Sequence, residues 1–290
     1  MRWIDCCLTS LRASSVAVKI IVIDNASTDG TPAHITAHFP EAELIATGEN
    51  LGFGKANNIG LRKAVEDNAD YVFLLNQDAW VQESTLQTLV QVADEHPEYG
   101  IISPLHHDGS NAHFDHKFIE YIQQNECPNL LEDSYFGRLK PIYTTTFVNA
   151  AAWLLPISCV KKVGGFDPLF PHYGEDVDYV QRCKANGMLV GIVPLTTICH
   201  DARVQEWSEI MWNEKRMLTI YLSEVKSMGG SLKGNMVVFL KNRFDNLTSH
   251  LLYRQFKLFR FRWLLTFKVV KMLGPIKQAR KASKAEGAFL

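Results

Sequence analysis

The chain has 290 residues, of which 47% are hydrophobic and 21% charged, a composition that suits a soluble globular protein with no repeat or low-complexity segment. No stretch holds 18 uncharged apolar residues, so the sequence predicts no membrane-spanning helix. The formal net charge of -1 conceals an asymmetry: residues 231–290 carry 13 Lys and Arg against two acids, whereas residues 1–230 carry 17 basic and 29 acidic groups. An acidic part followed by a basic tail indicates that the tail meets an anionic partner.

In the first third of the chain, short apolar runs alternate with segments of helical spacing. The pattern predicts strands at 19–25, 43–48, 71–78 and 100–105, and helices from Thr31 onward, at 54–67 and at 81–96. Such alternation is typical of a parallel sheet covered by helices, in which ligands gather at the carboxyl ends of the strands. The polar endings Asp24-Asn25 and 76–78 are therefore expected to meet at one edge.

The pattern weakens between 106 and 146, and we expect loops around HHDGSNAHFDH (106–116) and CPNLLEDS (127–134). Apolar residues return at 147–157, GGFDPLF (164–170) has the composition of a turn, and 175–187 is predicted as a helix with acids in its first turn. Residues 189–200 follow as one or two strands that end on His200.

Two glycine- and asparagine-rich segments are candidates for binding a nucleotide. In VIDNASTDGT (22–31), the carboxylate of Asp24 at a strand end could bind a base or ribose hydroxyls, although a turn with a helix cap explains it equally. In ENLGFGKANNIG (49–60), Gly52 and Gly54 permit a close backbone approach before a helix N-terminus, which attracts anions. A plain strand-to-helix turn is the alternative there.

Three further motifs carry ionisable groups. Asp78 in the triplet N76-Q77-D78 could hold a hard divalent cation, or could cap the next element. The acids at 175, 176 and 178 could supply a general base, or could only complement the helix dipole. His200 could be a metal ligand or a structural histidine. The six cysteines contain no CxxC pair, so we expect inert thiols in a reducing cytoplasm.

Taken in order, VIDNASTDGT, N-x-GFGKANN-x-G, FLLNQD, GGFDPLF, EDVDYVQR and a strand-final histidine closely resemble the family 2 glycosyltransferases, most of all their rhamnosyltransferase-like members. The resemblance spans residues 3 to 205. It implies an α/β GT-A fold, a mixed and mostly parallel sheet flanked by helices. It also implies a glycosyltransferase domain at 1–205, followed by a helical C-terminal region at 206–290.

The resemblance assigns roles to particular residues. It places six residues around the donor nucleotide: Asp24, Asn25, Asn50, Gly52, Phe53 and Asn57. Asp78 would bind Mg²⁺ or Mn²⁺ at the family's D-x-D position, where Asn76 replaces the first acid, and His200 would complete the coordination. Asp176 would be the catalytic base, with Glu175 as the alternative. The implied reaction is an inverting displacement at the anomeric carbon of a nucleotide sugar.

The start of the chain departs from the family pattern. Members begin with a strand of the type V-S-V-I-I-V-T-Y-N, whereas MRWIDCCLTSL resembles the helix that follows that strand. Because the missing strand lies inside the sheet, we expect unpaired edges and an open apolar groove. The alternative function is a non-catalytic relative that binds nucleotide sugars. A nucleotidyltransferase would need a glycine-rich basic loop after its first strand, and the sequence has none.

The segment 251–273 of the tail mixes aromatic and basic residues. At about 100° per residue, five cations fall within an arc of about 120°: Arg254, Lys257, Arg260, Lys268 and Lys271. The opposite side carries Leu252, Phe256, Phe259, Trp263, Phe267 and Val270. This pattern predicts an amphipathic helix on an anionic membrane, peripheral to the inner face of the plasma membrane, which suits a lipid-linked or glycan acceptor. The alternative is a helix packed on the catalytic domain; nucleic acid is not expected, since no recognition fold accompanies the segment.

Overall fold

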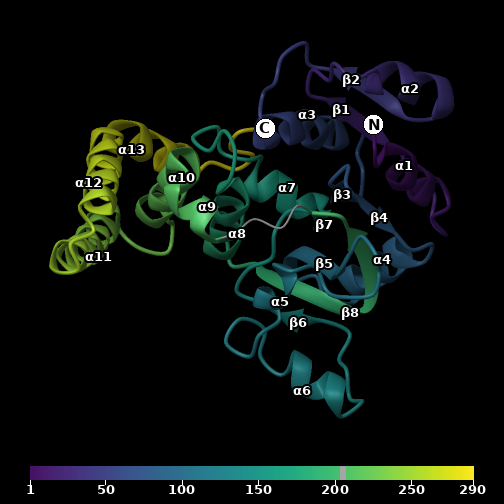
Figure 1. The fold of residues 1–290 in the computed structure, drawn as a ribbon. Helices are drawn as coiled ribbons and strands as arrows, with labels where there is room; N and C mark the ends of the chain where they lie inside the picture. The colour runs from purple at the N-terminus through teal and green to yellow at the C-terminus, as the bar shows by residue number, and fades with distance from the viewer. Residues whose placement is uncertain (203–206) are drawn as a thin grey trace.

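The computed structural model describes residues 1–202 and 207–290, and Figure 1 shows their arrangement. The strands are β1 (Ile21–Asp24), β2 (Glu43–Ala46), β3 (Tyr71–Leu75), β4 (Ala79–Val81), β5 (Tyr99–Asp108), β6 (Tyr143–Thr144), β7 (Ala152–Pro156) and β8 (Leu189–His200). The helices up to residue 185 are α1 (Ile4–Arg12), α2 (Thr31–His38), α3 (Phe53–Glu66), α4 (Thr85–Glu95), α5 (Phe118–Tyr121), α6 (Leu130–Tyr135), α7 (Ile157–Val163) and α8 (Glu175–Ala185). The C-terminal helices are α9 (Trp207–Trp212), α10 (Glu214–Lys226), α11 (Leu232–Leu252), α12 (Phe256–Lys271) and α13 (Leu273–Ala282).

The strands form a mixed sheet, and its pairing corrects one detail of the prediction. The larger sheet has the order β3-β7-β5-β8-β4, with β6 also paired to β8. In the described residues β1–β2 and β5–β8 are parallel, while β3–β7, β5–β7, β4–β8 and β6–β8 are antiparallel. The predicted mixed sheet is confirmed, and the detail concerns the balance of the pairings: four of these six are antiparallel, because β7, β4 and β6 each run opposite to their neighbours.

The sheet is open where the sequence predicted a missing strand. β1 pairs only with β2, and β3 pairs only with β7, so each presents one unpaired edge within the described part of the chain. Helix α3 contacts both strands and covers one face of the opening. Ile23 of β1 and Phe73 of β3 are half-buried.

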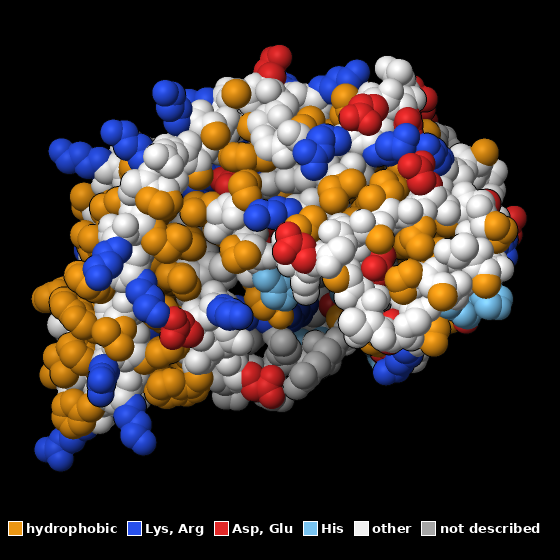
Figure 2. All heavy atoms as spheres, turned by 90° about the horizontal axis from the view of Figure 1, so that it is seen from above, with side chains coloured by type: hydrophobic (Ala, Val, Ile, Leu, Met, Phe, Trp, Pro, Cys, Tyr) orange, Lys and Arg blue, Asp and Glu red, His pale blue; other side chains and the backbone are white. Residues whose placement is uncertain are grey.

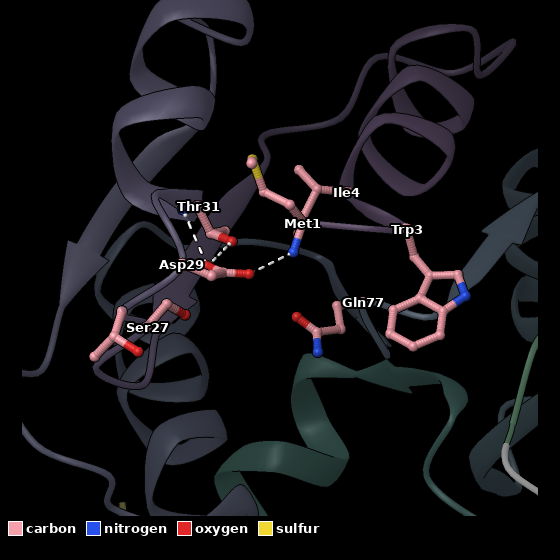
Figure 3. A pocket seen from close by; sticks show the side chains of 8 residues that line it. Met1, Trp3, Ile4, Ser27, Asp29, Thr31 and Gln77 are labelled. Atoms are coloured by element: carbon pink, nitrogen blue, oxygen red, sulfur yellow. Dashed lines mark hydrogen bonds and ion pairs between the residues drawn. The ribbon is translucent and has the colours of Figure 1, made fainter.

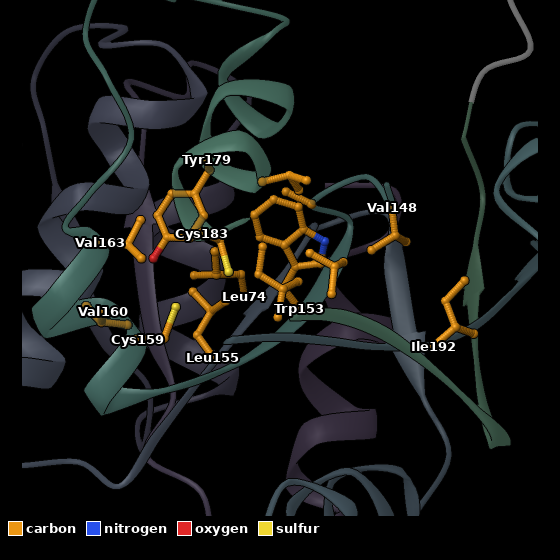
Figure 4. Packing of buried hydrophobic residues seen from close by; sticks show 14 of the residues in the cluster. Leu74, Val148, Trp153, Leu155, Cys159, Val160, Val163, Tyr179, Cys183 and Ile192 are labelled. Carbon is orange, nitrogen blue, oxygen red and sulfur yellow. The ribbon is translucent and has the colours of Figure 1, made fainter. Parts of the chain in front are cut away.

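The main core lies between the larger sheet and helices α7 and α8. Trp153 of β7 is fully buried, and its indole stacks on Phe166 and contacts Tyr179. Figure 4 shows Cys159 and Cys183 beside these rings, and both thiols are free, as are the other four cysteines. Because α8 packs on this core, the acids in its first turn are held at a fixed place relative to the sheet.

The structure corrects three predictions of secondary structure. The helix expected at 81–96 begins only at Thr85, because residues 79–81 form β4 against β8. Helix α6 falls in the loop expected around 127–134, and β5 extends to Asp108, into the loop expected around 106–116. The segment 251–273 is not one helix: α11 ends at Leu252, Arg254 has a positive φ of 57°, and α12 starts at Phe256.

Helices α10–α13 build a second core and form one end of the molecule (Figure 1). Tyr221 and Phe239 pack edge to face there, with Leu265 and Val269 of α12 buried beside them. The predicted domain boundary at 205/206 lies outside the described residues and stays a prediction. Among the helices that the structure describes, none combines the length and apolar character that crossing a bilayer requires.

Candidate active site

Two loops at the carboxyl ends of β1 and β2 hold the residues expected around a nucleotide. The Asn25 side chain donates to Asn50 Oδ1 over 3.0 Å and accepts from the Leu51 backbone N–H at 2.7 Å. Asn50 Oδ1 also accepts from the Gly52 N–H at 2.9 Å. Asp24 is buried and accepts from the Ser27 N–H at 3.2 Å, the turn contact that the alternative interpretation predicts. The two loops are therefore one hydrogen-bonded unit.

The start of α3 packs on the loop that precedes α8. Gly52 has a φ of 80°, and a Cβ there would lie 2.1 Å from the Pro171 carbonyl oxygen. The Phe53 ring meets Phe166 edge to face at 5.7 Å, and Asn57 donates to the Phe53 carbonyl over 3.0 Å. These contacts show that Gly52, Phe53 and Asn57 each have a role in packing or hydrogen bonding. They also place the predicted nucleotide-binding residues at the start of α3 close to α8.

A pocket of about 250 Å³ lies between the ends of β1 and β3 (Figure 3). Its lining includes Ser27, Asp29 and Gln77, and Asp29 binds the N-terminal ammonium at 2.7 Å and the Thr31 hydroxyl at 2.5 Å. Gln77 thus faces this pocket, whereas its neighbour Asp78 faces β8. Residues that follow β1 and Gln77, which follows β3, thus line one pocket, although the two strands belong to separate sheets.

Asp78 and His200 come together where β4 pairs with the end of β8. His200 Nε2 lies 3.6 Å from Asp78 Oδ1, and its Nδ1 lies 3.0 Å from Asp115 Oδ2. Burial disfavours the imidazolium, but the hydrogen bonds and charges of Asp115 and Asp78 outweigh it and raise the pKa of His200 to about 9. Asp115 is itself fixed, because its Oδ1 accepts from the N–H groups of Lys117 and Phe118 at 2.9 and 3.1 Å.

Asp78 and His200, the two predicted metal ligands, lie beside each other, and Asp78 keeps 27% of its side chain exposed. A metal ion bound there would have to displace the proton that the two carboxylates hold on His200. Within residues 1–202 and 207–290, no group of three His, Cys, Asp or Glu side chains is placed to hold a metal. The described part of the protein thus offers two ligands at most here, which leaves positions for phosphate oxygens and water.

The acids at the start of α8 have different surroundings. Glu175 is buried, its Oε2 has no hydrogen-bond partner among the described residues, and burial raises its pKa to about 7. Asp176 is half-buried, and its Oδ1 accepts from the Val177 N–H at 2.8 Å. Burial raises the pKa of Asp176, while the charges of Lys117 and Arg216 act in the opposite direction. Asp176 is the more accessible of the two carboxylates.

Sequence reasoning missed two segments that complete this site. Residues 115–121 lie between the Asp78–His200 pair and the start of α8. Asp115 pairs with His200, and the charge of Asp176 acts to raise the pKa of Lys117 and of Tyr121. Helix α10 brings Arg216 over the Tyr173 ring at 4.4 Å, next to the start of α8. The only signal for the first segment was the acid and histidines of HFDH (113–116), in a region without periodicity.

Comparisons with known proteins point the same way. The sequence model described as Glycosyl transferase family 2 matches residues 2–151. The N-acetylglucosaminyl-diphospho-decaprenol L-rhamnosyltransferase of Mycobacterium tuberculosis is 26% identical over 215 residues, which cover 65% of this chain and 68% of that protein. The dTDP-rhamnosyl transferase RfbF of Shigella flexneri is 26% identical over 182 residues, 62% of this chain and 59% of RfbF.

Among solved structures, the chain resembles GalNAc-T7 with UDP, GalNAc and Mn²⁺, with a TM-score of 0.50 and 14% identity. The likeness covers 78% of this chain and 48% of GalNAc-T7. At this identity the likeness concerns the fold, and it confirms the predicted GT-A architecture of a mixed sheet flanked by helices.

Proposed function

The chain belongs to glycosyl transferase family 2 and is a glycosyltransferase, and we propose that it moves a sugar from a nucleotide-sugar donor to a hydroxyl group of a glycan or lipid-linked acceptor. The observation that carries this proposal is that the acids of α8 lie next to residues of two other predicted groups: a Cβ at Gly54 would lie 3.7 Å from Glu175 Cβ, and the charge of Asp176 acts on Lys117, in the segment that bonds His200. The three predicted groups are the Asn25–Asn50 loops, the Asp78–His200 pair and the acids of α8.

In the proposed reaction the configuration at the anomeric carbon is inverted. Asp176 takes the proton of the acceptor hydroxyl while its oxygen attacks the anomeric carbon, and the nucleoside diphosphate leaves. Asp176 suits this role because it remains accessible and its pKa is raised by burial, which makes its carboxylate a stronger base. Glu175 is the second candidate, and its burial against α3 argues for a supporting role.

On the donor side, Asp24, Asn25, Asn50, Gly52, Phe53 and Asn57 are proposed to line the nucleotide site. Asp78 and His200 would hold Mg²⁺ or Mn²⁺. A divalent cation bound there would neutralise charge on the diphosphate as it departs. The similar GalNAc-T7 was crystallised with UDP and Mn²⁺, which supports the choice of a divalent metal.

Turnover of an Asp176→Asn protein tests the assignment of the base. We expect turnover to fall on the order of 10²–10⁴-fold, while binding of the nucleotide sugar, measured by calorimetry, is kept. The exposed acid Glu66, at the far end of α3 from these loops, supplies the control, since Glu66→Gln should change neither quantity. Wild-type turnover in Asp176→Asn would show that another group is the base. Donor binding by a wild-type chain without any transfer would favour the non-catalytic alternative.

The relatives suggest the class of acceptor and the process. The names of two similar proteins specify rhamnosyl transfer, and one of these names an acceptor of the diphospho-decaprenol type. Another relative is the succinoglycan biosynthesis protein ExoO of Rhizobium meliloti, 27% identical over 152 residues. By analogy, we place this chain in cell-surface polysaccharide synthesis, on the cytoplasmic side of the plasma membrane.

A face of α11 and α12 supports the proposed contact of 251–273 with an anionic membrane. Helix α12 buries Leu258, Leu265 and Val269 against the second core. Its other side exposes large apolar residues, among them Trp263 at 56% and Phe267 at 53%. Phe256, Trp263 and Phe267, which belong to the apolar side predicted from the sequence, are therefore exposed to solvent and are not packed on the catalytic domain.

Helix α11, which the sequence did not single out, extends this face. Its exposed apolar residues are Val237, Val238, Leu240, Phe244, Leu251 and Leu252. Figure 2 shows apolar side chains gathered at the end of the molecule that carries these helices, with Lys and Arg among them. Helix α12 contains no acid, and each Lys or Arg near an anionic surface contributes about 1 kcal/mol.

Vesicle flotation of the full chain tests this contact. We expect binding to vesicles that contain phosphatidylglycerol, weaker binding at high salt, and a loss of at least about tenfold in affinity for Trp263→Ser/Phe267→Ser. Tyr135→Ser provides a matched control, because Tyr135 is 84% exposed on α6, away from this face. Equal flotation of the double variant and the wild type would refute the assignment of the surface.

A further inference from the structure

We propose that Lys226, at the end of α10, is a positioning residue for the catalytic helix α8. This inference rests on the proposed function, because it concerns the placement of the carboxylate assigned as the base. Lys226 is fully buried, which is rare for a lysine and requires compensating partners.

The partners of Lys226 come from three separate parts of the chain. Its ammonium group pairs with the Asp178 carboxylate in the first turn of α8, and with Asp167 Oδ2 at 2.8 Å in the turn before α8. It also donates to the Ser283 hydroxyl at 3.0 Å, just after α13. One cation therefore ties the C-terminal helices to both the catalytic helix and the loop that leads into it.

A second buried cation completes the cluster. Arg182, one turn further along α8, donates to Asp178 Oδ2 over 2.8 Å and to the carbonyls of Val163 and Gly165 over 2.8 and 2.7 Å. Both oxygens of Asp178 are thus occupied by cations. Two carboxylates face two cations, so the cluster is balanced in charge, and each member depends on the others because all four are buried.

The cluster fixes the end of α8 that carries the proposed base. Asp178 follows Asp176 by two residues, and both its carboxylate oxygens are held, while its N–H closes the first turn on the Gly174 carbonyl at 2.9 Å. Helix α10 also packs on the same turn: a Cβ added to Gly174 would lie 3.4 Å from Thr219 Cβ. Without the Lys226 contact, the first turn of α8 loses its ionic tie to α10.

A displacement of about 1 Å at a reacting group can lower a rate on the order of 100-fold. We therefore expect Lys226→Met to lower kcat about 100-fold. The KM for the nucleotide sugar should stay within about twofold, because the hydrogen bonds that join the donor-side loops, Asn25 to Asn50 and the Leu51 N–H to Asn25, are made without residues 164–171. Hydrogen exchange of the α8 amides should become at least about tenfold faster, with the exchange of β5 and β8 unchanged.

The double variant Lys226→Met/Asp178→Asn distinguishes two effects of losing Lys226: the loss of the contact that positions α8, and the burial of an unbalanced negative charge. It leaves Asp167 and Arg182 as one anion and one cation, so the cluster stays neutral and the protein should fold even where the single variant does not. We expect its kcat to remain low, because the tie between α10 and α8 is still absent. Lys277→Met is the control, since Lys277 is an exposed lysine on α13 of the same helical region.

A kcat of the double variant near that of the wild type, with unchanged exchange of the α8 amides, would overturn the proposal. Loss of kcat and of donor affinity in equal measure would do so as well, since it would indicate general unfolding of the site. A wild-type chain that transfers no sugar would contradict the proposed function alone; the exchange of the α8 amides still tests the tie between the helices.

Discussion

Replacement of Glu175 by Gln should stabilise the folded protein at alkaline pH. Glu175 is only 5% exposed, its Oε2 has no partner in the described part of the chain, and burial holds its pKa at about 7, against 4.5 for an unperturbed glutamate. Because the folded-state pKa is the higher one, the folded protein binds this proton more tightly than the unfolded chain does. The resulting stability is complete below pH 4.5 and is lost as the pH rises through 7.

The size of the effect follows from the two pKa values. Each unit of difference between the two pKa values corresponds to about 1.4 kcal/mol, so the difference between 4.5 and about 7 corresponds to about 3 kcal/mol of unfolding free energy. Most of this free energy is lost between about pH 5 and pH 8. Gln has nearly the same shape and no charge to desolvate. Since a buried amide without a partner costs about 1 kcal/mol, we expect a net gain of about 1–2 kcal/mol at pH 8.

Urea unfolding at several pH values measures this directly. The free energy of unfolding of the wild type should fall between about pH 5 and pH 8 more steeply than that of Glu175→Gln. The exposed Glu49→Gln protein should follow the wild type throughout. If the Glu175→Gln and wild-type curves ran parallel over this range, the carboxyl group of Glu175 would not be the buried acid described above.

Two further predictions concern residues that hold the site together. Asp115→Asn removes the acceptor that orients His200 Nδ1, so Mn²⁺ affinity measured by titration calorimetry should fall about 10–100-fold, and an unchanged affinity would contradict that role. Gly52→Ala should cost about 3 kcal/mol or more of stability in urea, because its Cβ would overlap the Pro171 carbonyl. Gly48→Ala should cost only about 1 kcal/mol, since Gly48 shares the positive φ but has open space around it, and equal losses would refute the steric argument.

The local pattern of the sequence predicted most elements of the first third of the chain, because each strand there is a short apolar run and each helix has its own apolar face. The family resemblance, not the local pattern, paired Asp78 with His200, and the structure brings their side chains to 3.6 Å. The local pattern could not find Asp115, which lies in a non-periodic segment and gains its role only from a contact 85 residues away. Nor could it place Lys226, because nothing in the sequence of α10 distinguishes a buried lysine from a solvated one.

The pairing of the strands was less predictable than the strands themselves. Strand β4 follows β3 after three polar residues, and a run as short as AWV carries no period of its own. Its pairing with β8 depends on where β8 lies, which is a tertiary property. The same holds for α12, whose two apolar stripes look alike in sequence; only the packing of Leu258, Leu265 and Val269 decides which stripe is buried.

The opening between β1 and β3 bears on how the two halves of the site are held together. Within the described residues no ladder of hydrogen bonds joins these strands, so the Asn25–Asn50 loops are placed relative to Asp78 by side-chain packing. The contacts that do this come from α3 and the residue before it: Gly52 lies against Pro171, and Asn58 exchanges hydrogen bonds with the Phe166 backbone, at 2.9 Å to its carbonyl and 2.6 Å from its N–H. The loop 164–171 also contains Asp167, which pairs with Lys226 of α10, and Gly165, whose carbonyl accepts from Arg182 of α8. Helices α3, α8 and α10 therefore all contact this one loop. That loop, rather than the sheet, is the structural centre of the proposed site.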